Sequence, residues 1–191
     1  GDAGCCGALQ AHDGDAAGAA RQAKATAAAF SDCDIVVTNT AGCGAAMKAY
    51  EDAAFARKVR DLSEVLLDAD WRPARPTEAQ VAAYHDPCHL SHGQGIRSQP
   101  RELLRRAGFR LVEVAEADYC CGGAGSYTLL QPDLADRLMR RKVANLAASA
   151  PACIVSANPS CLMQIRRGLA ESGCDVPVLH LAEVLWASSS P

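Results

Sequence analysis

Apolar and polar positions along the chain divide it into helical and strand segments that follow one another in a repeated order. Residues 16–30 are rich in alanine, which favours a helix, and residues 34–38 form a short β-branched run typical of a buried strand. Residues 45–69 show helical periodicity, from which we expect two helices. Residues 71–80 contain two prolines and predict a connector.

The chain beyond this connector repeats the plan. We expect strands at 81–85, 109–114, 153–157 and 176–181, and helices at 100–107, 133–149 and 161–172 with a short helix at the end. Strands that alternate with helices predict an α/β fold with a mostly parallel sheet. In such sheets the loops that follow the strands form the ligand crevice.

An internal duplication is visible in the sequence itself. The segment "IVVTNTAGC" (35–43) aligns with "CIVSANPSC" (153–161), and a Cys-Cys-Gly motif precedes each of them. The fold class we predict is therefore α/β with two pseudo-repeated halves of short, mostly parallel strands and flanking helices. We assign a first repeat to 1–70, truncated at its N-terminus, a connector to 71–80, and a second repeat to 81–191. We expect the sequence to be a piece of a longer protein.

Composition excludes several classes of function. The net charge of −3 lacks the basic footprint of a nucleic-acid-binding domain. No apolar run approaches the roughly 18 residues of a transmembrane helix, so we expect no membrane span. Ten cysteines among 191 residues are unusual. We place the chain in a reducing compartment, where clustered cysteines more often bind metal or do redox chemistry than form disulfides.

The clustered cysteines predict a metal centre. Thiolates are soft ligands, and four that converge select zinc or an iron–sulfur cluster. Two adjacent cysteines can reach one centre only from an irregular loop, which Gly122 and Gly123 permit. Such neighbouring ligands suit a cluster of several irons better than a single zinc ion, although zinc stays an alternative. The second half offers Cys88, Cys120, Cys121 and Cys161, and the first half offers Cys5, Cys6 and Cys43.

Other candidates are less specific. His85 and His89 flank Cys88 and could bind metal, donate hydrogen bonds to cluster sulfurs, or be ordinary loop residues. We favour ordinary loop residues over metal ligands for both. Gly122 and Asn158 join them as candidates for surrounding the centre. We expect Cys153 to be a core residue of its strand. The chain shows no phosphate-binding loop and no serine elbow, and we assign no catalytic residue.

The phrases "AGCCGAL", "DPCHLSHGQG", "CCGGAGSYTLLQPDLADRL" and "IVSANPSC" resemble the cysteine-rich CCG domain. This domain occurs in one of the subunits of heterodisulfide reductase and in several related iron–sulfur subunits. These motifs are most similar to those of the glycolate oxidase (glycolate dehydrogenase) iron–sulfur subunits. The resemblance covers nearly the whole chain.

The resemblance implies an electron-transfer subunit with an iron–sulfur cluster, of the [4Fe–4S] type. It implies an FAD-containing partner that oxidises glycolate to glyoxylate, and a downstream quinone or membrane electron carrier. It also implies a cytoplasmic location, peripheral at the inner face of the membrane. The two ferredoxin-type motifs of the family's N-terminal part are missing from this sequence.

Two rival interpretations stay open. One is a thiol–disulfide oxidoreductase of the heterodisulfide reductase kind, whose motif ends in Cys-x-x-Cys. Here Asn158 stands where the first of those cysteines would be, which argues against it. The other is a zinc-stabilised docking domain with no redox role.

Overall fold

The computed structural model describes residues 4–189, which form an α/β fold with parallel strand pairs in two sheets. The predicted fold class is confirmed. The strands are β1 (Val36–Thr38), β2 (Val59–Asp61), β3 (Val81–Tyr84), β4 (Arg110–Val112), β5 (Cys153–Ser156) and β6 (Val178–His180). The helices are α1 (Ala8–His12), α2 (Ala16–Ala29), α3 (Ala41–Lys48), α4 (Ala53–Ala56), α5 (Leu62–Asp68), α6 (Cys88–Ser91), α7 (Gln99–Arg106), α8 (Tyr127–Leu130), α9 (Pro132–Ala148), α10 (Pro159–Glu171) and α11 (Leu181–Ser189).

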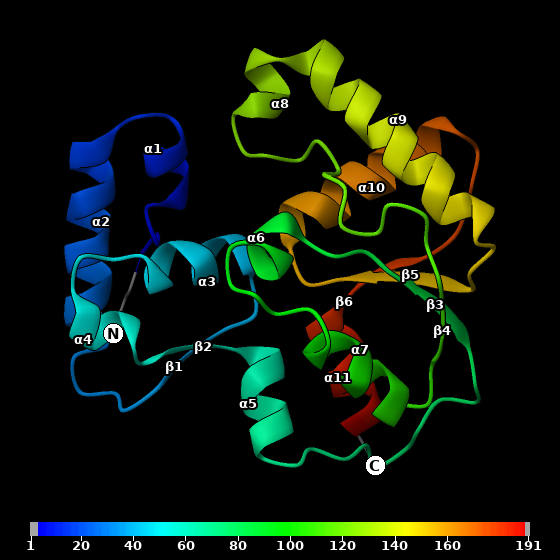
Figure 1. The fold of residues 1–191 in the computed structure, drawn as a ribbon, viewed down its shortest axis with the longest axis horizontal. Helices are drawn as coiled ribbons and strands as arrows, with labels where there is room; N and C mark the ends of the chain where they lie inside the picture. Colours follow the sequence, from blue (N-terminus) through cyan, green and yellow to red (C-terminus); the bar gives the residue numbers. More distant parts are fainter. Residues whose placement is uncertain (1–3, 190–191) are drawn as a thin grey trace.

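The larger sheet has four strands in the order β4-β3-β5-β6 and is covered on both faces. Helices α9 and α10 lie on one face, and α7 and α11 lie on the other (Figure 1). Every residue of β5 is buried, and β3 is buried at all but its first position. Central strands of a parallel sheet are enclosed on both faces, which explains why these segments are continuously apolar or small rather than alternating.

Helix starts in this half are set by proline. Pro132 and Pro159 are the first residues of α9 and α10, and Pro100 is the second residue of α7. Proline lacks a backbone N–H, which the first turn of a helix does not need, and its φ angle already suits the helix. Because α10 begins at Pro159, Cys161 lies in its first turn, directly beyond the end of β5.

The first half contains a strand where we predicted only helix. Residues 45–69 form the end of α3, then α4, β2 and α5, so the prediction of two helices was wrong. β2 is only three residues long and pairs with β1 in the register Val36↔Val59. Its strand conformation depends on that pairing and on burial of Val59, which local periodicity does not report. Asp52 and Asp61 accept hydrogen bonds at the starts of α4 and α5, and mark where the helical run is interrupted.

The two sheets differ in how many strands pair with β1 and with β5, its counterpart in the sequence repeat. β5 pairs with β3 on one side and β6 on the other, whereas β1 pairs only with β2 among residues 4–189. Ile35 and Val37 are 45% exposed, while Cys153 and Val155, with which the sequence repeat aligns them, are buried in the apolar cluster that includes α7 and α11. Helix α5 packs against α7, so the first half also contributes to the core of the second. The division at 71–80 into two repeats stays a prediction.

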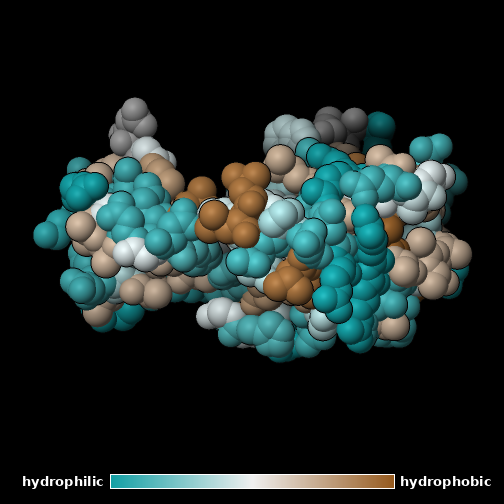
Figure 2. Space-filling model, turned by 90° about the horizontal axis from the view of Figure 1, so that it is seen from above, coloured by the Kyte–Doolittle hydropathy of each residue, from teal (hydrophilic) through white to brown (hydrophobic). Residues whose placement is uncertain are grey.

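The two halves meet where their equivalent turns face each other. The Ala41 N–H donates to the carbonyl oxygen of Ala157 at 3.1 Å, and the Gly42 N–H donates to Asn158 Oδ1 at 3.2 Å. Gln94 Nε2 adds a hydrogen bond to the Ala41 carbonyl oxygen at 3.0 Å. The space-filling view shows a mostly hydrophilic surface with apolar groups gathered in the hollow between the two parts (Figure 2). The hydrogen bonds from Ala41 and Gly42 hold the start of α3 against the turn that leads into α10.

Candidate metal centre

Four cysteines of the second half lie on three chain segments that converge beyond the ends of β3 and β5. Cys88 begins α6, Cys161 lies in the first turn of α10, and Cys120 and Cys121 lie in the loop between β4 and α8. The carboxyl ends of parallel strands meet at one edge of the sheet, so residues far apart in sequence become neighbours here. Cys121 and Cys161 are buried, and Cys88 and Cys120 are partly buried.

Neighbouring sulfurs influence one another's pKa values in the order Cys88–Cys120–Cys121–Cys161, although of these four only Cys121 and Cys161 belong to a group of donors within 4.8 Å of one another. Contact with Cys120 raises the pKa of the Cys88 thiol, and contact with Cys120 and Cys161 raises the pKa of Cys121. The same contacts lower the pKa values of Cys120 and Cys161, with the Cys121 thiol as the first cause for both. Four thiolates so close together need a cation to become charged at the same time.

The two glycines of the motif allow this crowded loop. Gly122 has φ +81°, a left-handed conformation that favours glycine, and a Cβ there would lie 2.4 Å from the Ala135 carbonyl oxygen in α9. The Gly122 N–H donates to Cys120 Sγ at 3.3 Å, and the Gly123 N–H donates to Cys121 Sγ at 3.4 Å. The Cys-Cys-Gly-Gly sequence thereby supplies two sulfurs and a backbone donor to each of them.

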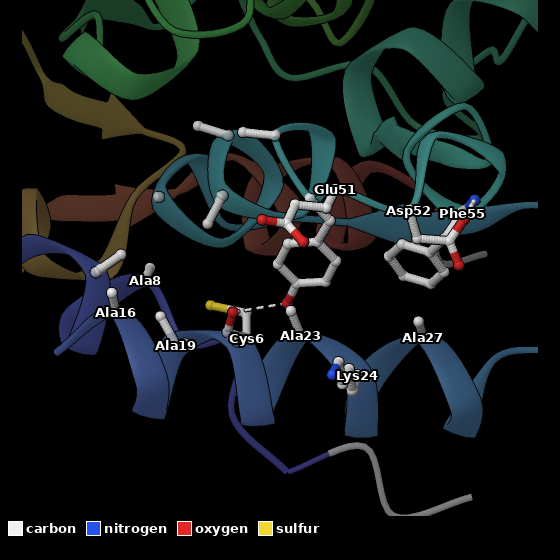
Figure 3. A pocket seen from close by; sticks show the side chains of 18 of the residues that line it. Cys6, Ala8, Ala16, Ala19, Ala23, Lys24, Ala27, Glu51, Asp52 and Phe55 are labelled. Carbon is white, nitrogen blue, oxygen red and sulfur yellow. Dashed lines mark hydrogen bonds between the residues drawn. The ribbon is translucent and has the colours of Figure 1, made fainter.

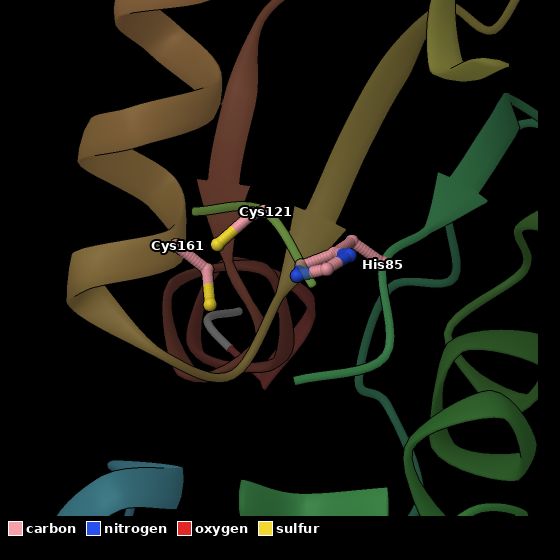
Figure 4. Close-up of side chains that lie close together, drawn as sticks. All are labelled: His85, Cys121 and Cys161. Atoms are coloured by element: carbon pink, nitrogen blue, oxygen red, sulfur yellow. The ribbon is translucent and has the colours of Figure 1, made fainter. Parts of the chain in front are cut away.

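His85 completes the buried part of the group. One ring nitrogen of His85 and the sulfurs of Cys121 and Cys161 all lie within 4.8 Å of one another (Figure 4). The side chain is 1% exposed, and neither ring nitrogen makes a hydrogen bond of ordinary length. A buried polar group without a partner is unusual in a native protein. Soft sulfurs beside an unpartnered imidazole are a donor set that fits zinc or an iron–sulfur cluster, and no carboxylate belongs to this group within residues 4–189.

The loop that carries the cysteine pair is anchored to α9. Lys142 is fully buried, and its Nζ donates to the carbonyl oxygens of Glu116 and Ala117, at 3.1 Å for the latter. Burial lowers the pKa of Lys142. The Ala117 carbonyl also accepts the Asp86 N–H at 3.2 Å. Lys142 therefore positions the loop rather than an incoming ligand, a role that the sequence pattern did not reveal.

The first-half cysteines converge less completely. The Cys6 thiol contacts Cys43 and Cys5, and contact with Cys43 lowers the pKa of Cys6 to about 6. The pKa of Cys43 is raised by the same contact. Cys5 is exposed, and the Gly7 N–H donates to its sulfur at 3.5 Å. Among the described residues these three do not form a group with all donor atoms within 4.8 Å.

A groove of 1120 Å³ adjoins this first set of cysteines. It lies between α2 on one side and α3 and α4 on the other, with Cys6 on its wall (Figure 3). Most of its lining side chains within α2 and α3 are alanines. In the second half Met139 and Val143 of α9 lie against Gly168 of α10, which brings those helices together. The helices α2 and α3 of the first half instead leave a groove between them.

The remaining candidates fall outside the buried group. His89 Nδ1 lies 3.7 Å from Cys88 Sγ, and the His89 ring stacks on His12 with ring centres 5.2 Å apart. Asn158 Nδ2 donates to Cys161 Sγ at 3.4 Å. Cys153 is buried in β5 within an apolar cluster, as expected for a core residue. His85 stands at the end of the apolar run 81–85, and the structure places it in the buried group with Cys121 and Cys161.

Fold and site together define a duplicated cysteine-rich α/β domain, and comparison with known proteins agrees. The sequence profile of the cysteine-rich (CCG) domain matches residues 1–48 and 82–166. The chain belongs to this family, which confirms the resemblance seen in its motifs. Within residues 4–189, none of the helices combines the length and the apolar character that crossing a membrane requires.

Three curated relatives show which kinds of protein the chain is similar to. The chain is 36% identical to the probable glycolate oxidase iron–sulfur subunit of Bacillus subtilis, over 95% of this chain and 45% of that protein. It is 34% identical to the glycolate oxidase iron–sulfur subunit of Escherichia coli, over 84% of this chain and 44% of that protein. It is 33% identical to a subunit of the fumarate reductase (CoM/CoB) of Methanothermobacter marburgensis, over 80% of this chain and 32% of that protein. The chain thus spans less than half the length of these relatives.

Proposed function

We propose that this chain is the cysteine-rich part of an iron–sulfur electron-transfer subunit, in a complex of the glycolate oxidase type. The observation that carries the proposal is the convergence of Cys88, Cys120, Cys121 and Cys161 beyond the ends of β3 and β5, with Cys121 and Cys161 buried within 4.8 Å of each other. The names of the relatives from Bacillus subtilis and Escherichia coli support the choice of iron–sulfur chemistry.

Cys88, Cys120, Cys121 and Cys161 would hold the centre, which we propose to be of the [4Fe–4S] type. An iron–sulfur centre accepts and releases single electrons. The chain contributes burial at Cys121 and Cys161, and N–H donors to the sulfurs from Gly122, Gly123 and Asn158. Hydrogen bonds to the sulfurs and exclusion of water are the means by which a protein tunes the reduction potential of such a centre.

The substrate chemistry belongs to a partner in this proposal. An FAD-containing protein would oxidise glycolate to glyoxylate, and this chain would pass the electrons toward a quinone or another membrane carrier. That role is consistent with a peripheral position at the inner face of the cytoplasmic membrane. Cys5, Cys6 and Cys43 would form a vestigial or incomplete second site.

The test is the metal content of anaerobically purified protein, with its visible spectrum. We expect about four iron and four sulfide per chain, with the broad absorption of a cluster. Cys121→Ser should lose both, because serine removes a soft ligand. Cys153→Ser is the matched control, since Cys153 is similarly buried but lies in the apolar core of β5, and it should retain them.

The opposite result has a definite meaning. About one zinc per chain without visible absorption would overturn the electron-transfer role of this segment. It would favour a zinc-stabilised docking domain in its place.

A further inference from the structure

We propose that His85 is a direct nitrogen ligand of the centre held by Cys121 and Cys161, so that the donor set is mixed sulfur and nitrogen. This inference rests on the proposed function, because it concerns the same centre. The inference goes beyond the proposed function by adding a ligand that is not a cysteine.

The first argument is the position of the ring. The backbone N–H of His85 donates to the Val155 carbonyl oxygen at 2.9 Å, which ties the end of β3 to β5. Cys161 follows β5 and Cys121 lies in the loop before α8, so the ring faces two sulfurs from separate segments (Figure 4). Each of these donors is buried, and all three lie within 4.8 Å of one another.

The ring of His85 is buried without a hydrogen bond of ordinary length. Neither nitrogen has a hydrogen-bond partner of ordinary length, and the Cys161 sulfur is the group that it influences. The neighbouring Asp86 makes no hydrogen bond to the ring, and both its oxygens accept from Arg101 at 2.6 Å. A buried imidazole in a native protein has at least one partner, and a metal ion between these three donors would provide it.

The spacing of the three donor atoms suits a single tetrahedral ion. With bonds of about 2.3 Å to sulfur and about 2.0 Å to nitrogen, the ligand atoms around such an ion lie roughly 3.5–3.8 Å apart. The three donor atoms here are within 4.8 Å, a separation that small side-chain rotations close. A metal is therefore compatible with the observed backbone.

His85 would be a neutral ligand, whereas a cysteine in its place would add a thiolate and one more negative charge to the centre. Replacement of cysteine by histidine ligands raises the reduction potential of iron–sulfur centres. His85 would therefore hold the centre at a higher potential than an all-cysteine set, and His85→Cys should lower it.

The test uses the whole chain, with Co²⁺ as a spectroscopic probe and ¹⁵N-histidine labelling. We expect thiolate-to-cobalt absorption and, by pulsed electron paramagnetic resonance, a strong hyperfine coupling to ¹⁵N. In His85→Phe, which keeps an aromatic ring but removes both nitrogens, the absorption should persist while that coupling disappears. Its affinity for Co²⁺ should fall at least about tenfold. His180→Phe is the control, because His180 is partly buried but does not belong to the group, and it should change neither signal.

Each outcome separates this inference from the proposed function. Thiolate absorption without nitrogen coupling in the unaltered chain, or an undiminished coupling in His85→Phe, would overturn the role of His85 and leave the cysteine site intact. If His85→Phe does not fold, the labelled unaltered chain still decides, since absence of the coupling overturns the proposal. A chain that binds neither Co²⁺ through thiolates nor iron would instead refute the proposed function.

Discussion

Gly122→Ala should destabilise the cysteine loop by more than its backbone conformation alone explains. Gly122 and Gly173 both have positive φ angles, +81° and +70°, so alanine is strained at both. That strain costs about 1–2 kcal/mol. At Gly122 the new methyl group would also lie 2.4 Å from the Ala135 carbonyl oxygen, whereas at Gly173 nothing lies within 4 Å.

Overpacking of this kind costs a further 1–3 kcal/mol, approximately, so we expect a total loss of about 2–5 kcal/mol for Gly122→Ala. Gly173→Ala provides the baseline of about 1–2 kcal/mol. Urea unfolding of both metal-free variants, followed by circular dichroism, gives the two free energies of unfolding. Iron content after reconstitution should fall only in Gly122→Ala. Equal losses of stability in the two variants would refute the packing of the loop against α9.

Three further predictions concern residues that support the site and the first half. Lys142→Met should cost about 1–3 kcal/mol, because the Glu116 carbonyl oxygen loses this donor and the Ala117 carbonyl oxygen keeps only the Asp86 N–H, and thermal unfolding would measure it. A variant as stable as the unaltered chain would show that the loop does not depend on this side chain. Arg101→Met should cost a similar amount, roughly 1–3 kcal/mol, because Asp86 loses a bidentate partner; the figure lies below that of a fully buried pair since Arg101 is 27% exposed. Urea unfolding beside Arg105→Met, which removes an exposed arginine of the same helix, tests this, and equal losses would contradict it. Burial raises the pKa of Asp61 above 3.8, so the folded state holds its proton longer than the unfolded state. Stability from this group is present below the unfolded pKa and is lost as the pH rises through the folded one. Asp61→Asn should flatten that part of the pH–stability curve, and an unchanged slope would exclude Asp61 as its source.

Much of the architecture was predictable because its signals are local. The β-branched and apolar runs at 34–38, 81–85 and 153–157 correspond to β1, β3 and β5, with differences of one or two residues at their ends. The alternation with helices predicted the parallel sheet, and Pro100 correctly marked a helix start. The strand β2 was missed because three residues acquire strand conformation only by pairing with β1.

The sequence by itself determined the chemistry of this protein: two Cys-Cys-Gly motifs, each followed by a third cysteine, and glycines that permit an irregular loop. It also determined the edge of the sheet at which the cysteines gather, because parallel strands end on the same side. Only the tertiary structure decided which donors touch. The distances from His85 to Cys121 and Cys161 depend on the packing of β3, β5, α9 and α10, which no local pattern encodes. The open groove beside Cys6 likewise follows from how α2 and α3 are spaced, which is decided by contacts between segments distant in sequence.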